Sequence, residues 1–399
     1  MKRILSLLLV LVMVFSLCAC KKNDATGEST AASLTTDATQ AATTPIADPN
    51  AGRELLQPLL DARKLPALKS REEMLDILQK EMYGYIPEAP TEVTYTVEKD
   101  TIENYAAGKA NIHKVTISGK LKGNPFSFPF ITVLPKSEEK VPFFVHIAFS
   151  ASNVHRFQPT EELVDNGYAV LFFNYEDVAS DNSKFDNGVC TALYPDGKRS
   201  ITDPGKIAIW AWAAMRVMDY AETELADKLD MSRSIVCGHS RLGKTALLAG
   251  AYDTRFQFVY SNDSGCTGAA ISRYKTGEDL HRVINANPFW YCTGFNAKYD
   301  YGEYKLPFDQ HYLLACVAPR KLLVGSAIKD KTADPLSEQL ACLAASPAFP
   351  NGFACTVVAK AGEEYFEGDI GYHVREGTHY FHREDWQKLM KFVEYHSSK

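Results

Sequence analysis

The chain has 399 residues, of which 46% are hydrophobic and 23% charged, and its formal net charge is −6. Its Lys and Arg residues form no cluster or stripe, which argues against nucleic-acid binding. The cysteines show no CxxC pair or other zinc-type spacing, and we expect neither a metal nor another cofactor.

The first 19 residues are predicted to be a bacterial lipoprotein signal peptide. Lys2 and Arg3 form a charged start, and residues 4–17 are an apolar run too short to span a bilayer. The run closes in Leu-Cys-Ala-Cys, which resembles the lipoprotein cleavage signal and makes Cys20 the lipid attachment site. Two acyl chains on Cys20 would anchor the protein to the extracellular face of the cell envelope. The alternative is an ordinary signal peptide with a chance cysteine.

Residues 20–52 are predicted to be a lipid-anchored, flexible linker. They are rich in Thr, Ala and Ser and hold too few large apolar residues to bury a core. Residues 53–399 are then expected to form one globular domain. That domain contains an odd number of cysteines, so at least one should be free, and Cys266 and Cys292 are predicted to be bridged.

Two different patterns of apolar residues follow one another along the domain. Residues 91–135 alternate apolar and polar side chains, the period of two that predicts antiparallel strands. Short apolar runs then alternate with helical patterns at 206–222 and 241–252, which predicts a parallel sheet covered by helices on both faces. The apolar runs are 141–149, 169–174, 234–238, 256–261, 322–327 and 353–358.

This order of elements predicts an α/β-hydrolase, a three-layer sandwich with a mostly parallel central sheet and an antiparallel N-terminal part. A Rossmann-type sheet fits the parallel part equally well. However, no GxGxxG follows the first parallel run, so dinucleotide binding loses its main support.

Ser240 is the candidate nucleophile, because it falls between a predicted strand and a predicted helix. A sharp strand-turn-helix exposes the serine hydroxyl and needs small neighbours, such as Gly238. The usual second glycine two positions after the serine is missing, since Leu242 stands there and Gly243 follows. The start of the helix would direct backbone N–H groups at an anion that forms over Ser240.

The base and the acid of a serine hydrolase of this fold should follow the nucleophile along the chain. His379 is the candidate base, since Gly377 and Thr378 predict a loop there, and His373 and His382 are its competitors. Two acids, Asp263 and Asp330, each follow a predicted strand, and either could orient the imidazole. The sequence does not choose between them.

Four blocks of sequence resemble the glucuronoyl esterases of carbohydrate esterase family 15. They are 238–244, 261–266 with 272–278, 306–311 with 318–320, and 373–379 with Asp385 and Trp386. Members of that family cleave, without a metal, the ester between 4-O-methyl-glucuronic acid of xylan and lignin alcohols. By resemblance Ser240 is the nucleophile, His379 the base and Asp263 the acid, a position where the family more often has Glu. Asp330 matches a second acidic position of some bacterial members.

The resemblance also implies the roles of several neighbours. Arg241 matches an arginine of the oxyanion hole, and guanidinium chemistry suits that role. Lys244 and Glu278 match residues that contact the sugar, and Trp290 belongs to a matching aromatic block. One position departs from the family pattern, because Thr332 stands where a tryptophan packs on the uronate. Losing that aromatic ring would cost roughly 1 kcal/mol or more of sugar binding. The oxyanion loop at 148–153 is also irregular.

These residues predict a serine-dependent carboxylic ester hydrolase that cleaves glucuronate esters through an acyl-enzyme. A uronate is favoured because Arg241 and Lys244 place two cations beside Ser240 in a net-acidic protein. Another carbohydrate esterase, such as a deacetylase, is one alternative. A non-catalytic carbohydrate-binding surface lipoprotein of the same fold is the other. The expected partners are glucuronoxylan or lignin-carbohydrate fragments and the membrane at Cys20, and the chain is expected to be a monomer.

Overall fold

The computed structural model describes residues 50–152, 157–300 and 302–398 of the chain. The predicted signal peptide, Cys20 and the linker up to residue 49 lie outside the described residues. The chain from Gly52 to Lys399 forms one compact unit. No described helix is both long and apolar enough to cross a membrane.

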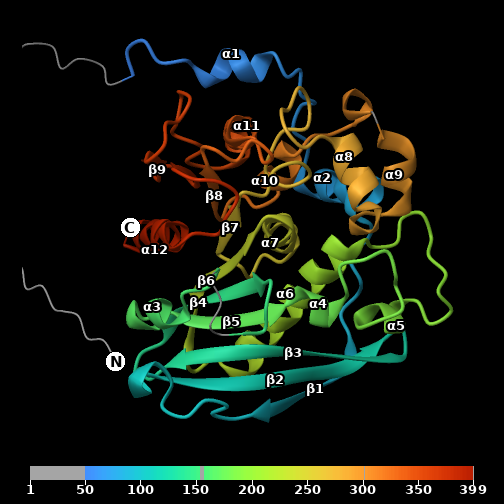
Figure 1. Cartoon of the computed structure of the whole chain (residues 1–399), viewed down its shortest axis with the longest axis vertical. Helices are drawn as coiled ribbons and strands as arrows, with labels where there is room; N and C mark the ends of the chain where they lie inside the picture. The colour runs from blue at the N-terminus through green and yellow to red at the C-terminus, as the bar shows by residue number, and fades with distance from the viewer. Residues whose placement is uncertain (1–49, 153–156, 301, 399) are drawn as a thin grey trace, which may run out of the picture. The chain divides into compact units, whose positions relative to one another are not determined.

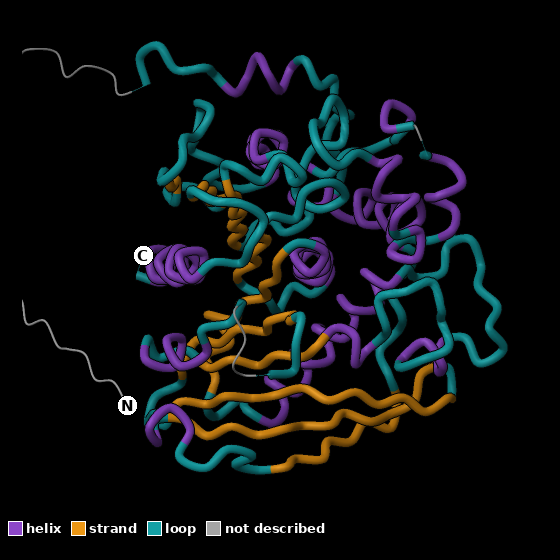
Figure 2. Tube along the Cα trace, in the orientation of Figure 1, coloured by secondary structure: helices purple, strands orange, loops and turns teal. Residues whose placement is uncertain are grey.

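A ten-stranded mixed sheet runs through this unit in the order β1-β2-β3-β5-β4-β6-β7-β8-β10-β9 (Figures 1 and 2). The strands are β1 Thr91–Glu98, β2 Ala110–Leu121, β3 Asn124–Pro135, β4 Val141–Ala148, β5 Ala169–Asn174, β6 Leu229–His239, β7 Phe258–Asn262, β8 Lys321–Ala327, β9 Glu364–Tyr365 and β10 Ile370–Arg375. Strands β1, β2, β3 and β5 pair antiparallel, whereas β5, β4, β6, β7, β8 and β10 are parallel neighbours. The predicted antiparallel entry and parallel sheet are both confirmed.

The side-chain patterns explain which strands lie at the centre. Strand β2 is buried mainly at alternate positions, so the period of two in its sequence marks a strand with one covered face. Every residue of β4 is buried, because helices cover both of its faces. Phe143 and Phe144, which are adjacent in β4, belong to the two different hydrophobic cores on either side of the sheet.

Helices form the outer layers. The longer ones are α1 Leu56–Asp61, α2 Arg71–Leu78, α3 Thr160–Asp165, α6 Lys206–Glu224, α7 Arg241–Tyr252, α8 Leu280–Ala286, α9 Thr293–Tyr299, α11 Pro335–Ala345 and α12 Arg383–Ser397, and the shorter ones are α4 Tyr175–Val178, α5 Val189–Leu193 and α10 His311–Ala315. Helices α3 and α12 pack on one face of the sheet through Leu163 and Trp386. Helices α6, α7 and α11 pack on the other face through Trp210, Leu247 and Leu340 (Figure 1). The predicted three-layer sandwich is confirmed.

The prediction of a strand at 353–358 is wrong. That segment makes only isolated bridges, from Phe353 to Ile370 and from Val357 to Leu55. The parallel neighbour of β8 is instead β10, whose residues are all buried. Gly371 interrupts the apolar residues of β10, so the sequence pattern did not predict this strand. The tertiary reason for this glycine is the packing of α12, since a Cβ on Gly371 would lie 2.6 Å from the ring of Phe392.

The predicted disulfide between Cys266 and Cys292 is also wrong. Seven cysteines lie in the part of the chain that the structure describes, and each is free and buried. The Sγ atom of Cys292 contacts the carbonyl oxygen of Lys80 at 3.9 Å. These cysteines therefore pack as small apolar side chains rather than as cross-links.

Candidate active site

The turn between β6 and α7 holds Ser240 in a strained backbone conformation, with φ 58° and ψ −127°. A glycine is needed two positions earlier, since a Cβ on Gly238 would lie 2.2 Å from the carbonyl oxygen of Leu242. A Cβ on Gly243 would lie only 3.0 Å from the Cβ of Ser264. The second glycine of this elbow is therefore needed three positions after the serine, which accounts for the departure from the usual spacing.

The exposed hydroxyl of Ser240 begins a chain of hydrogen bonds. Its Oγ lies 2.8 Å from Nε2 of His379, and Nδ1 of His379 lies 2.5 Å from Oδ2 of Asp330. The imidazole is 41% exposed, whereas the Asp330 side chain is 2% exposed. An ionised carboxylate only accepts hydrogen bonds, so Nδ1 donates to Asp330 and Nε2 is left to accept the serine proton.

Asp330 is held ionised by its surroundings. Its Oδ1 accepts from the backbone N–H groups of Thr332 and Ala333, both at 3.1 Å. Burial favours a raised pKa, but the hydrogen bond and charge of His379 and these two N–H groups outweigh it and lower the pKa of Asp330.

The carboxylate of the other candidate acid, Asp263, has different hydrogen-bond partners. Its Oδ1 accepts from the N–H of Ala327 at 2.7 Å, and its Oδ2 lies 3.4 Å from Nη2 of Arg375. Its side chain is fully buried, which raises its pKa well above the ordinary value. The structure thus places Asp330, and not Asp263, on the imidazole.

The two competing histidines have other roles in the fold. His373 lies inside β10, where its Nε2 contacts the hydroxyl of Tyr260 at 3.0 Å and burial lowers its pKa to about 3. His382 precedes α12, and its Nδ1 accepts from the N–H of Glu384 at 3.2 Å. Only His379 among these three candidates reaches Ser240.

Arg241 starts α7 beside the serine and forms an ion pair with Asp181. Its guanidinium carbon lies 5.1 Å from the centre of the Trp290 ring and 5.9 Å from that of Phe149. Its Nε is buried and makes no hydrogen bond to the described residues. This unused donor lies on the side chain that follows the nucleophile.

Asp181 connects this side of the site, and the sequence did not point to it. Its carboxylate accepts from Nε1 of Trp290 at 2.7 Å and from the hydroxyl of Tyr175 at 3.0 Å, as well as from Arg241. Asp181 therefore holds the guanidinium and the indole in one arrangement. Its one sequence signal was its place shortly after a parallel strand, the sheet edge where ligands of this fold class bind.

Lys244 was expected to contact the sugar, but its side chain is buried in the structure. Its Nζ donates to the backbone carbonyls of Ser264, at 2.6 Å, and Cys266, at 2.5 Å. Burial lowers the pKa of Lys244, and the nearby carboxylate of Glu278 opposes that shift. Glu278 itself is half-buried and its N–H donates to the carbonyl oxygen of Thr332 at 3.3 Å. Of the two expected sugar contacts, Glu278 is the more accessible one.

Asp263, Asp330 and His379 also offer potential metal-ligand atoms that lie within 4.8 Å of one another. Both ring nitrogens of His379 already have partners, on Ser240 and on Asp330. A metal ion bound to either ring nitrogen would have to displace one of these two hydrogen bonds. The arrangement suits the transfer of a proton better than the binding of a cation.

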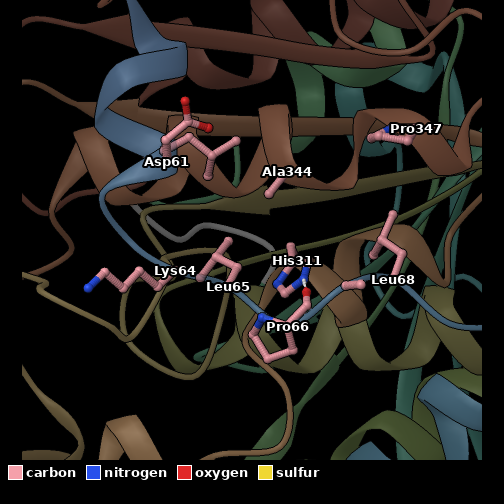
Figure 3. Close-up of a pocket in the computed structure, with 10 residues that line it drawn as sticks. Asp61, Lys64, Leu65, Pro66, Leu68, His311, Ala344 and Pro347 are labelled. Carbon is pink, nitrogen blue, oxygen red and sulfur yellow. Dashed lines mark hydrogen bonds between the residues drawn. The ribbon is translucent and has the colours of Figure 1, made fainter.

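The hollow shown in Figure 3 lies elsewhere, between the segment after α1 and the start of α10. It has a volume of about 500 Å³ and is lined mainly by apolar side chains, including Leu65, Leu68 and Pro347. Its buried imidazole, His311, contacts the carbonyl oxygen of Pro66 at 2.9 Å. None of the residues of the serine-histidine-aspartate chain lines this hollow, so it contributes nothing to that chemistry.

The known proteins that this chain resembles are esterases, which agrees with the geometry of the site. A family profile described as "Glucuronyl esterase, fungi" matches residues 116–351. Carbohydrate esterase MZ0003, from an unknown prokaryotic organism, is 32% identical over 82% of this chain and 84% of its own. The solved structure of a promiscuous CE15 esterase from a marine bacterial metagenome matches with a TM-score of 0.73 at 30% identity, over 82% of this chain and 91% of that chain. The 4-O-methyl-glucuronoyl methylesterase of Hypocrea jecorina is 27% identical over 63% of this chain, which spans about half of that relative, 51%.

Proposed function

Because the chain belongs to the glucuronoyl esterases of carbohydrate esterase family 15, we propose that it hydrolyses esters of glucuronic acid through an acyl-enzyme on Ser240. The observation that carries this proposal is the unbroken chain of hydrogen bonds from Ser240 through His379 to Asp330. A nucleophile, a base and an oriented acid in contact are what acyl transfer from an ester requires.

In the first half of the reaction, Oγ of Ser240 attacks the carboxyl carbon of the ester as its proton passes to Nε2 of His379. The tetrahedral intermediate then collapses, and the alcohol leaves with the proton that His379 returns. Water then attacks the carbonyl carbon of the acyl-enzyme as one of its protons passes to Nε2 of His379. The bond to Oγ of Ser240 breaks as His379 gives that proton to Oγ, and the uronic acid is released. Asp330 holds the imidazole in the correct tautomer and stabilises its charged form throughout.

The substrate class is supported by the charges beside Ser240. The guanidinium of Arg241 is the accessible cation there, and Trp290 provides an aromatic ring next to it. A uronyl group presents both a polar carboxyl and an apolar sugar face, which match a cation and a ring. At position 332 the exposed threonine offers no stacking surface, and Trp290 is only 5% exposed, so the sugar would depend more on Arg241 and Glu278.

A direct test compares kcat/KM for a benzyl or methyl glucuronate ester with that for an acetyl ester, using the Ser240→Ala variant as the blank. The glucuronate ester is expected to be the better substrate. A preference for the acetyl ester would replace this proposal with a deacetylase. If neither ester is cleaved and a fluorophosphonate probe does not label Ser240, the chain is a carbohydrate-binding protein.

Arg241 is the proposed side-chain donor to the oxyanion, together with backbone N–H groups at the start of α7, which have no partner within the helix. The Arg241→Ala variant is expected to lower kcat by about 10²- to 10³-fold, because this donor acts mainly in the transition state. Steady-state kinetics on the glucuronate ester measure the effect. Arg383→Ala, at an exposed arginine whose partner is Glu162, is the matched control. A rise in KM with unchanged kcat would instead assign Arg241 to ground-state binding.

We further propose that the mature protein acts as a monomer, anchored through acylated Cys20, on the outer face of a bacterial cell envelope. The charged start, the short apolar run and the Leu-Cys-Ala-Cys ending support this proposal. Metabolic labelling with a palmitate analogue checks it: the wild-type chain should be labelled and the Cys20→Ser variant should not. Equal labelling of both chains would mean that the lipid is attached elsewhere. Sedimentation of the detergent-free domain checks the monomer.

A further inference from the structure

A buried guanidinium lies directly beneath the loop that carries His379. It belongs to Arg375, the last residue of β10, which is 3% exposed. Its Nη1 donates to the carbonyl oxygen of Glu376 at 2.9 Å, and its Nη2 donates to those of Thr378, at 3.2 Å, and Tyr380. The carbonyls on both sides of His379 thus point inward to one side chain, while the imidazole of His379 reaches Ser240.

A glycine allows the loop to wrap so closely. Gly377 has a φ of 111°, and a Cβ there would lie 2.7 Å from Nη1 of Arg375. The carbonyl oxygen of Gly377 accepts from the N–H of Lys329 at 2.9 Å, so the loop is also joined to the residue before Asp330. The imidazole of His379 and the carboxylate of Asp330 are therefore both held in place relative to the loop around Gly377.

The guanidinium is itself held from the opposite side by two carboxylates. Its Nε lies 2.9 Å and 3.1 Å from the oxygens of Asp385, and its Nη2 lies 3.4 Å from Oδ2 of Asp263. Asp385 also accepts from the N–H of His382 at 2.7 Å, which ties the end of the loop to α12. Burial would lower the pKa of Arg375, but the Asp385 and Asp263 carboxylates raise it, so the cation is kept.

We propose that Arg375 is a positioning residue for His379, and that Asp263 acts through Arg375 rather than as the acid of the triad. This inference rests on the proposed function, since it concerns the base of that reaction. The imidazole must meet Ser240 and Asp330 at once, at 2.8 Å and 2.5 Å, so a loop held at one end alone would leave both contacts loose. A misplacement of about 1 Å at a reacting group can cost about 10²-fold in rate.

The test compares Arg375→Lys with Arg320→Lys. Arg320 is a matched control, because it too is a buried arginine that donates to three backbone carbonyls, those of Gly250, Asp253 and Phe256, away from the site. A lysine keeps the charge at either position but cannot span the same set of acceptors. We expect kcat of Arg375→Lys on the glucuronate ester to fall by about 10- to 10²-fold with KM nearly unchanged. Arg320→Lys should lower the melting temperature by a similar amount and keep kcat.

Two further measurements separate positioning from general damage. The proton of the short bond between His379 and Asp330 should give a far-downfield NMR signal in the wild type and in Arg320→Lys, and the signal should be lost or broadened in Arg375→Lys. If Asp263 acts through Arg375, the double variant Asp263→Asn with Arg375→Lys should lose no more activity than Arg375→Lys alone.

Unchanged kcat and an unchanged NMR signal in Arg375→Lys would overturn the positioning role. Fully additive losses in the double variant would overturn the role assigned to Asp263. The NMR signal reports the geometry of the loop without any substrate. A wild-type chain that shows the signal but cleaves no ester would therefore refute the proposed function and leave the positioning role to be judged by the same signal.

Discussion

Replacing His379 by alanine is expected to lower kcat for a glucuronate ester by about 10⁶-fold, the size of the loss when a serine hydrolase is deprived of its base. The imidazole is the only hydrogen-bond partner of Oγ of Ser240 found among the described residues, at 2.8 Å. Without it the hydroxyl keeps its proton at neutral pH and is a weak nucleophile. Single-turnover and steady-state kinetics, with Ser240→Ala as the reference for zero activity, measure the loss.

The control for this variant is His382→Asn, three positions along the same loop. His382 is exposed, and its contribution to the fold is to accept the N–H of Glu384 at the start of α12, which an asparagine side chain can also do. This variant should keep kcat within about twofold, as expected for a surface change outside the site. The assignment of the base would be wrong if His382→Asn lost the activity and His379→Ala kept it.

The Asp330→Asn variant is expected to lower kcat by about 10⁴-fold, the size seen when the acid of a serine triad becomes an amide. The structure dictates how the amide would lie. Oδ1 of Asp330 faces two backbone N–H groups, so the amide oxygen would stay there and the NH₂ group would face Nδ1 of His379. Nδ1 would then accept a hydrogen bond, which places the ring proton on Nε2 and leaves no acceptor for Ser240.

Asp263→Asn is the comparison for this experiment, because that carboxylate is also buried and also has an oxygen within 4.8 Å of a ring nitrogen of His379. It should reduce kcat by only about tenfold, as a group that acts through the placement of another. Kinetics of the two single variants and of the double variant separate the two roles. A loss in Asp263→Asn as large as that expected for Asp330→Asn would make Asp263 the acid, or make the two carboxylates share the role.

The arrangement around Arg241 has a consequence for how the enzyme treats its substrate. Asp181 holds both Arg241 and Trp290, so the guanidinium and the aromatic ring next to it are placed before any substrate arrives. Preorganised donors cost no rearrangement during the reaction, which is why they are effective in transition states. The Asp181 carboxylate also balances the positive charge of Arg241 in the free enzyme. This ion pair reduces the energetic cost of leaving a cation half-buried.

Much of the fold could be predicted from local sequence patterns. The period of two in residues 91–135 and the continuous apolar runs after it predicted the antiparallel and parallel halves of the sheet, because burial on one or on two faces leaves its mark on neighbouring residues. The elbow around Ser240 was likewise visible, since the turn needs particular small residues within a few positions. The predicted loop at Gly377 and Thr378 and the ends of two predicted strands supplied His379 and the two candidate acids, and the family blocks added the role of Arg241.

Other features depended on contacts between residues far apart in the chain. Asp263 and Asp330 each follow a strand, and only the path of the loop after β10 places the second of them on His379. Strand β10 itself was missed, because Gly371, its second residue, is explained by Phe392 of α12 rather than by its neighbours in sequence. Lys244 was expected to contact the sugar and is instead buried, where it donates to two backbone carbonyls, and no sequence pattern singled out Asp181.

The difference has one physical cause. Periodicity and turn geometry are imposed by the backbone over a few residues, so they can be recognised wherever they occur. The partner of a polar side chain is chosen by which loops meet at the edge of the sheet, and by the need of each buried charge or N–H group for a hydrogen bond there. The nucleophile could therefore be located from its own turn, whereas its acid and the arginine beneath its base were decided only when β6, β7, β8 and β10 came to lie side by side.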